Sequence, residues 1–135
     1  MNVFVDTAAF VAAALRRDAR HGEAKRLWQR LEVERARLIT TDWVFGETVT
    51  FVRRRAGYEA ARQLGEALRA SSALEIVTPT SELVDRAWDA FLAHSCSNLS
   101  LVDCLSFTIM RKRRIRKVFT FDEHFELAGF VRWTE

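Results

Sequence analysis

The sequence predicts an α/β protein in which helices cover a mostly parallel sheet. Short runs of β-branched and aromatic residues alternate with longer segments whose apolar residues recur every three or four positions. This alternation is typical of crossover units, which place strands in parallel and helices on the faces of the sheet. The chain has 135 residues and 49% apolar residues, so we expect residues 1–135 to form a single domain.

The first half of the chain supplies two expected strands and four expected helices. The strands, at 3–5 and 37–40, are short and rich in Val, Ile and Phe. The helices are expected at 8–16, 21–35, 43–55 and 58–70. Helical spacing is clear in the segment 21–35, where the apolar residues are Ala24, Leu27, Trp28 and Leu31. Gly57 ends the third of these helices, since glycine is a weak helix former.

The second half continues the alternation. A strand is expected at 74–77, closed by Pro79, and further strands at 118–121 and 130–133. Helices are expected at 81–94 and 101–113, with a loop at 95–99 between them and a possible short helix at 123–125. Trp28, Trp43 and Trp88 fall on apolar helix stripes, which favours core or dimer packing over RNA stacking.

Composition narrows the class of protein further. Two cysteines do not make a disulfide framework, and no apolar stretch is long enough to span a membrane. The first residues also lack the basic segment of a signal peptide. We therefore expect a cytoplasmic protein without a membrane partner.

Positive charge is concentrated in two clusters, Arg53–Arg55 and residues 111–117, although the net charge is only +3. Cations at helix ends complement the helix dipole, which explains part of this pattern. Six positive charges in seven residues exceed that need, so we expect contact with a polyanion.

Four acidic residues stand where a soluble domain would normally avoid them. Asp6 and Asp122 each end an apolar run, at the carboxyl ends of two expected strands, where ligands bind in parallel sheets. Glu47 and Asp103 fall within the apolar faces of two expected helices. A buried carboxylate is costly unless it is paired or binds a cation. If the fold brings the four together, the cleft would attract a hard cation such as Mg²⁺ or Mn²⁺.

Each of these residues also has a structural explanation. Asp6 or Thr7 could be a helix N-cap, and Asp122 could cap the short helix after it. Ser100 with Asp103 resembles a capping box, as does Thr120 with Glu123. Glu47 could lie at the edge of its stripe and reach solvent or an arginine.

Four segments in order resemble the PIN-domain ribonucleases, most closely the VapC-like toxins of toxin–antitoxin pairs. They are Val3–Phe10, Thr41–Thr48, Leu99–Phe107 and Val118–Phe125, and together they span nearly the whole chain. The resemblance implies a three-layer α/β/α sandwich and metal-dependent hydrolysis of RNA by an endoribonuclease. It implies that Asp6, Glu47, Asp103 and Asp122 are the catalytic acids holding Mg²⁺ or Mn²⁺, with Thr7 and Thr120 as supporting hydroxyls.

The same resemblance implies partners and targets. VapC-like toxins usually form homodimers, and a small VapB-like antitoxin silences them by placing its C-terminal segment in the active-site groove. Their targets are commonly structured RNAs, such as transfer RNA or ribosomal RNA loops, whose cleavage inhibits translation.

Three other interpretations make different demands on the sequence. A non-catalytic RNA-binding or partner-regulated module on the same fold would keep its RNA affinity in chelator. An aspartate-based phosphohydrolase needs a second acid two residues after the first, where this chain has Ala8. A zinc site formed by His94, Cys96, Cys104 and His124 matches no usual spacing, and the histidines are better explained as surface or helix-end residues.

Overall fold

The computed structural model describes residues 1–95 and 97–135, and it contains one five-stranded sheet in which all the paired strands are parallel. The strands are β1 Asn2–Val5, β2 Arg37–Thr41, β3 Leu74–Val77, β4 Lys117–Phe119 and β5 Val131–Arg132. The expected α/β class with a mostly parallel sheet is confirmed. Two expected strands are shorter than predicted, because β4 ends at Phe119 and β5 has only two residues. The hypothetical zinc ligand Cys96 lies outside the described residues.

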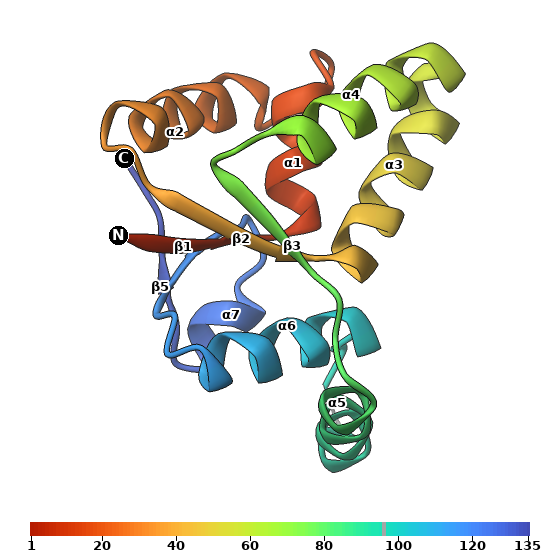
Figure 1. Cartoon of the computed structure of the whole chain (residues 1–135), viewed down its shortest axis with the longest axis vertical. Coiled ribbons are helices and arrows are strands. Elements are labelled where there is room, and N and C mark those ends of the chain that lie inside the picture. The colour runs from red at the N-terminus through yellow and green to blue at the C-terminus, as the bar shows by residue number, and fades with distance from the viewer. Residues whose placement is uncertain (96) are drawn as a thin grey trace.

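Helices cover both faces of this sheet, as the three-layer prediction requires (Figure 1). The helices are α1 Thr7–Ala14, α2 His21–Val33, α3 Asp42–Ala56, α4 Tyr58–Ala70, α5 Ser81–Ala93, α6 Leu101–Lys112 and α7 His124–Leu127. In Figure 1, α1 to α4 lie above the sheet and α5 to α7 below it. No helix in the described ranges is long and apolar enough to cross a membrane.

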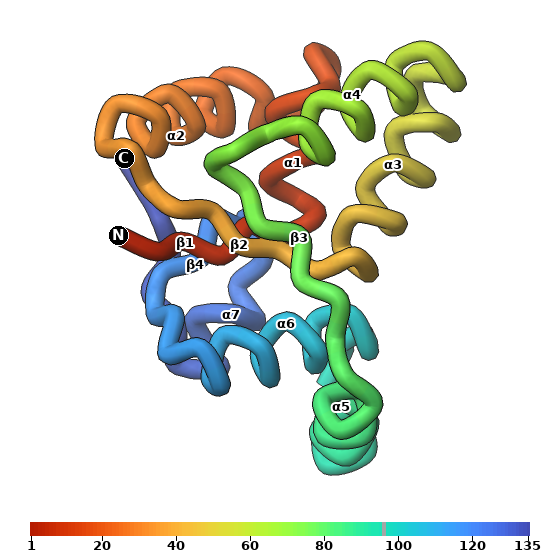
Figure 2. The backbone as a smooth tube through the Cα atoms, viewed as in Figure 1, coloured from red at the N-terminus to blue at the C-terminus, as the bar shows by residue number. Residues whose placement is uncertain are grey.

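The strand order β3-β2-β1-β4-β5 places β1 at the centre (Figure 2). From β1 the chain adds β2 and β3 on one side, and then returns to add β4 and β5 on the other. The order therefore reverses between β1 and β4. In open parallel sheets, ligands bind at such a switch point, outside the carboxyl ends of the strands.

The central strand is buried on both faces, because helices cover the sheet above and below. Val3, Phe4 and Val5 have no exposed surface, and neither do Val118 and Phe119 of the neighbouring strand. Parallel sheets covered on both sides typically have such continuous apolar strands. The packing holds the carboxyl ends of β1 and β4 at fixed positions.

Local sequence explains where α3 begins and ends. Thr41, the N-cap of α3, accepts a hydrogen bond from the amide of Val44 at 3.1 Å. At the other end, Gly57 has φ of +93°, in a region that other residues rarely adopt. The predicted break at Gly57 is confirmed, and α4 begins at the next residue.

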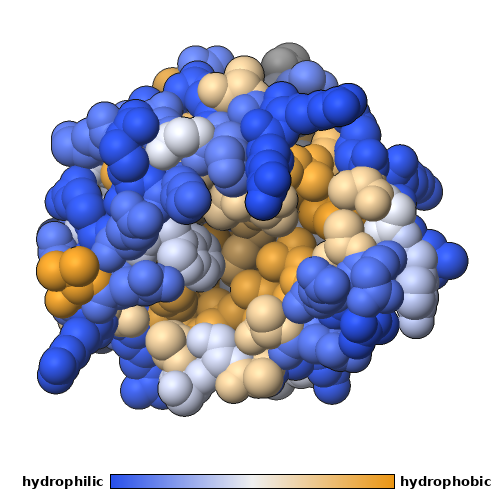
Figure 3. Space-filling view, turned by 90° about the horizontal axis from the view of Figure 1, so that it is seen from above, coloured by the Kyte–Doolittle hydropathy of each residue, from blue (hydrophilic) through white to orange (hydrophobic). Residues whose placement is uncertain are grey.

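Some apolar surface is left uncovered on each side of the sheet. The view from above shows an apolar hollow, and a cavity of about 490 Å³ there lies among side chains of α1, α2 and α4, including Phe10, Trp28 and Leu64 (Figure 3). On the other side, Trp88 and Leu92 of α5 are 48% and 57% exposed. Of the tryptophans expected in core or dimer packing, Trp28 and Trp43 pack against the core, and Trp88 lies on the surface.

Candidate metal centre

All four predicted acids line one open hollow of about 530 Å³ at the carboxyl ends of β1 and β4. Asp6 follows β1 directly, and Asp122 lies three residues beyond the end of β4. Glu47 comes from α3, and Asp103 from the first turn of α6. The fold thus brings together residues that are far apart in the sequence, at the switch point of the sheet.

Asp6 is the most deeply placed of the four. It is only 5% exposed, and its backbone amide donates to the carbonyl of Phe119 at 3.0 Å. The hydroxyl of Thr120 donates to Asp6 Oδ2 at 2.9 Å. Asp6 occupies the N-cap position of α1, but its side chain makes no capping hydrogen bond. Helix capping therefore does not explain this carboxylate.

Burial and a neighbouring charge make ionisation of Asp6 costly. Burial is the larger cause, and the negative charge of Asp103 is the second; together they raise the pKa of Asp6 from 3.8 to about 7, against the hydrogen bond from Thr120. A buried carboxylate with a raised pKa at a binding hollow is typical of a functional site. A bound cation would favour its charged form.

Asp103 has a capping role and also faces the hollow. Its Oδ2 accepts from the amide of Ser100 at 3.2 Å, and its own amide donates to Ser100 Oγ at 3.0 Å. The predicted capping box is thus confirmed. Burial, followed by the charges of Asp122 and Glu47, raises the pKa of Asp103, while the Ser100 hydrogen bonds oppose the rise. The cap fixes the position of this carboxylate without neutralising it.

Asp122 is held by local hydrogen bonds on both sides. Its amide donates to Thr120 Oγ1 at 3.0 Å, and its Oδ1 accepts from the amide of His124 at 2.9 Å. The predicted capping box of Thr120 with Glu123 is wrong, because Glu123 itself is the N-cap residue of α7. The Thr120 hydroxyl instead bridges Asp6 and Asp122, which links the two acids.

Glu47 lines the hollow but is exposed. Of the two interpretations, burial within the apolar stripe is wrong, and a position at the edge of the stripe that reaches solvent is confirmed. Phe51, one turn further along the helix, is likewise 38% exposed. Glu47 can therefore approach a ligand from the open side.

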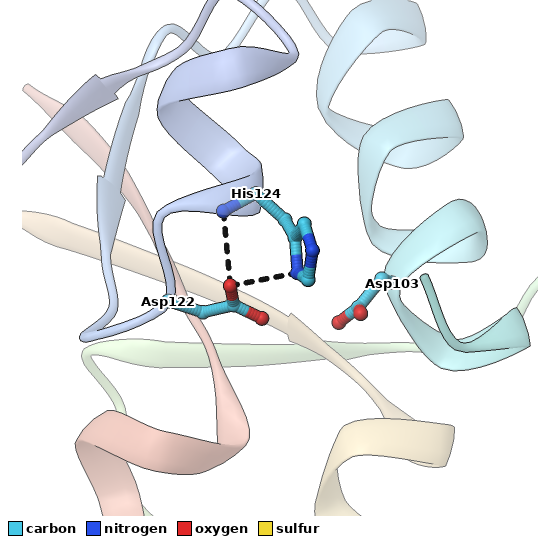
Figure 4. A group of neighbouring side chains, drawn as sticks. All are labelled: Asp103, Asp122 and His124. Atoms are coloured by element: carbon cyan, nitrogen blue, oxygen red, sulfur yellow. Dashed lines mark hydrogen bonds and ion pairs between the residues drawn. The ribbon is translucent and has the colours of Figure 1, made fainter. Parts of the chain in front are cut away.

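His124 belongs to this cluster of acids, which the sequence did not predict. Its ring lies beside Asp122 and Asp103 (Figure 4), and ligating atoms of these three side chains lie within 4.8 Å of one another. The distance from His124 Nδ1 to Asp122 Oδ1 is 2.8 Å. The interpretation as a helix-end residue is confirmed, because His124 is the first residue of α7, but its side chain is only 26% exposed and faces the acids. Its position two residues after Asp122 was the available sequence signal.

The hollow suits a divalent cation. Of the described residues that line it, four are the predicted acids, Asp18 is a fifth, and Arg20 is the one basic residue. Arg20 already forms a salt bridge with Glu23 at 3.2 Å. Nearby, Thr7 Oγ1 is buried with no hydrogen-bond partner among the described residues. Carboxylate oxygens with little compensating positive charge are the donors that hard cations prefer.

The two basic clusters lie in different places relative to this hollow. Arg55 stacks over the ring of Phe51, which lines the hollow, with its guanidinium 4.9 Å from the ring centroid. Residues 111–117 run from the end of α6 to the first residue of β4, and so lie at the amino edge of the sheet, on the opposite side. There Arg113 forms two hydrogen bonds with Glu75, at 2.8 and 2.7 Å. The larger cluster therefore does not face the site.

Comparison with known proteins identifies the family. Residues 3–131 match the PIN domain, so the chain belongs to the PIN-domain family. It is 39% identical over 129 residues to the 23S rRNA-specific endonuclease VapC20 of Mycobacterium tuberculosis, found in two strains, covering 96% of this chain and 95% of that protein. The crystal structure of M. tuberculosis VapC20, described as a sarcin–ricin loop cleaving toxin, superposes with a TM-score of 0.87 at 38% identity over 96% of each chain. The resemblance to VapC-like toxins is thereby confirmed.

Proposed function

We propose that this protein is a metal-dependent endoribonuclease and the toxin of a toxin–antitoxin pair, and that it cleaves 23S ribosomal RNA. The observation that carries the proposal is the meeting of Asp6, Glu47, Asp103 and Asp122 at the switch point of a PIN fold. The choice of RNA is supported by 39% identity, over nearly the whole chain, to a 23S rRNA-specific endonuclease.

In this proposal the four acids share the work of binding Mg²⁺ or Mn²⁺. Asp6 and Asp103 provide fixed oxygens, because Thr120 and Ser100 hold their carboxylates in place. Glu47 contributes from the open side, directly or through water, and Asp122 completes the site. A divalent cation held there lowers the pKa of a bound water and stabilises the charge that develops on the phosphate during in-line attack.

The shape of the site supports a polymeric substrate. The hollow is open to solvent, so the phosphodiester backbone of an RNA could pass across it without being enclosed. Arg20 and Arg55 lie at its rim, where they can contact phosphates on either side of the scissile bond. Such contacts give affinity that depends on salt and little on sequence.

The proposed partners are a second copy of the chain and a small VapB-like antitoxin. Self-association is supported by the exposed aromatic pair Trp88 and Phe91 of α5, whose rings stack with centroids 5.5 Å apart. Exposed aromatic residues are common in protein interfaces. Light scattering of the purified chain would measure its oligomeric state.

The proposal is tested with 23S ribosomal RNA and with a synthetic hairpin of the sarcin–ricin loop, in monovalent salt that keeps the hairpin folded. We expect discrete cuts with Mg²⁺ or Mn²⁺ and none in chelator. Asp103→Asn should reduce the cleavage rate by at least about 100-fold, as loss of an electrostatic catalytic group typically does. The matched control Asp85→Asn changes an exposed acid on α5 and should cleave normally.

Two results would contradict this proposal. Cleavage at the same rate in chelator would exclude metal-dependent chemistry. RNA binding that is unaffected by chelator, without cleavage by folded protein, would favour the non-catalytic binding module.

A further inference from the structure

We infer that His124 is a nitrogen ligand of the metal held by Asp103 and Asp122, and that it makes this side of the cleft prefer Mn²⁺ to Mg²⁺. The inference rests on the proposed function, because it assumes that the acids bind a divalent cation. It adds a fifth ligand of a different chemical type to the four carboxylates.

The surroundings of the His124 ring favour a bound cation. Its Nδ1 is buried, and no hydrogen bond satisfies it among the described residues. Asp122 Oδ1 lies 2.8 Å from Nδ1 and forms an ion pair with it only when the ring is protonated (Figure 4). That oxygen already accepts from the backbone amide of His124. In a neutral ring Nδ1 can be an acceptor that faces this oxygen, and a cation bound by both atoms would stabilise the arrangement.

The spacing of the donor atoms also suits a single ion. Two neighbouring ligands of an octahedral ion with bonds of about 2.1 Å lie about 3 Å apart. The 2.8 Å from His124 Nδ1 to Asp122 Oδ1 is close to that separation. Asp103 contributes an oxygen within 4.8 Å of the other two donors, so small side-chain rotations bring all three to one ion. In Figure 4 the Asp103 carboxylate points toward the histidine and Asp122.

The backbone fixes this arrangement before any ion binds. Asp122 and His124 are two residues apart in a tight turn that two hydrogen bonds hold, from the amide of Asp122 to Thr120 and from the amide of His124 to Asp122. Phe125, the next residue, is fully buried and anchors α7 in the core. The imidazole is thus held at the edge of the cleft.

The type of donor determines the preference for an ion. Carboxylates and water suit both Mg²⁺ and Mn²⁺, whereas imidazole favours transition metals. A site of oxygens alone would discriminate little between these two ions. Replacing the imidazole should therefore weaken Mn²⁺ binding much more than Mg²⁺ binding.

The test measures metal binding without RNA. Calorimetric titration of metal-free protein with Mn²⁺ and with Mg²⁺ would compare wild type, His124→Asn and the exposed control His94→Gln. Asparagine keeps a polar amide near the position of Nδ1 but has no imidazole. We expect His124→Asn to weaken Mn²⁺ binding about tenfold or more, to change Mg²⁺ binding less than about twofold, and His94→Gln to change neither.

Pulsed electron paramagnetic resonance of the Mn²⁺-loaded protein gives an independent readout. We expect a directly bonded nitrogen in wild type and its loss in His124→Asn. Absence of that nitrogen, or an equal loss of affinity for both ions, would overturn the inference and leave His124 as a residue that positions Asp122. Asp103→Asn separates this inference from the proposed metal-dependent function. Unchanged metal binding in that variant would contradict the metal site itself.

Discussion

Replacing Asp6 by asparagine should stabilise the metal-free protein at neutral pH, even though the change removes a proposed metal ligand. Asparagine is close in size to aspartate, and its amide oxygen can still accept the hydrogen bond that Thr120 donates. The substitution removes a charge that is buried near Asp103 and uncompensated. Stability and metal binding should therefore change in opposite directions.

The magnitude follows from the pKa. The folded value, about 7, lies above the ordinary value of 3.8, so the folded state binds the proton more tightly than the unfolded state. The free energy of unfolding then falls as pH rises between the two values and is level above the higher one. At about 1.36 kcal/mol per pKa unit, ionisation of Asp6 lowers the free energy of unfolding by at most about 4 kcal/mol. Between pH of about 5.5 and 8, the free energy of unfolding should fall by about 2 kcal/mol of this total.

Urea denaturation followed by tryptophan fluorescence, in chelator, would measure this effect. The stability advantage of Asp6→Asn over wild type should grow by about 2 kcal/mol between pH of about 5.5 and 8. Asp85→Asn, on the exposed side of α5, should show no such growth. Saturating Mg²⁺ should raise the stability of wild type more than that of Asp6→Asn. A variant that is less stable than wild type at both pH values, by a constant amount, would refute the reasoning.

Two further predictions concern the residues around the acids. Ser100→Ala removes the capping box of α6 and should cost about 1 kcal/mol in urea denaturation, as should Thr80→Ala at the N-cap of α5. Only Ser100→Ala should also weaken Mg²⁺ binding, measured by calorimetry, because Ser100 holds the carboxylate of Asp103. Equal Mg²⁺ affinities in the two variants would contradict this role of Ser100. Arg20→Ala should weaken RNA binding and reduce its salt dependence by about one counterion, whereas Arg113→Ala, at the far edge, should change neither in filter-binding titrations. The opposite result would mean that RNA contacts the amino edge of the sheet.

Periodicity predicted most of the fold, because the repeated burial of helix and strand faces leaves a direct pattern in the sequence. The helix Tyr58–Ala70 and the strand Leu74–Val77 were predicted with their observed bounds. The end of β4 was not, since Thr120 and Phe121 look like strand residues. The hydroxyl of Thr120 instead bonds to Asp6, and the chain turns away from the sheet.

The candidate site was predicted less completely than the fold. Asp6 and Asp122 could be placed together, because both follow parallel strands that proved to be neighbours. For Glu47 the sequence left burial and a solvent-facing stripe edge open, because helical spacing does not show what covers the edge of a helix face. The distance of residues 111–117 from the site could have been inferred, because a segment that precedes a parallel strand lies at the amino edge. The sequence did not group His124 with the acids, because helical spacing does not show that its ring lies beside Asp122.

The most direct test of the proposed metal centre is the location of bound Mn²⁺ in crystals, using its anomalous diffraction. We expect a peak in the hollow, in contact with carboxylate oxygens of Asp6, Asp103 or Asp122, and its loss in Asp103→Asn crystals. A well-ordered hollow without a peak at saturating Mn²⁺, or a peak only elsewhere on the surface, would contradict the claim that these acids form a metal centre.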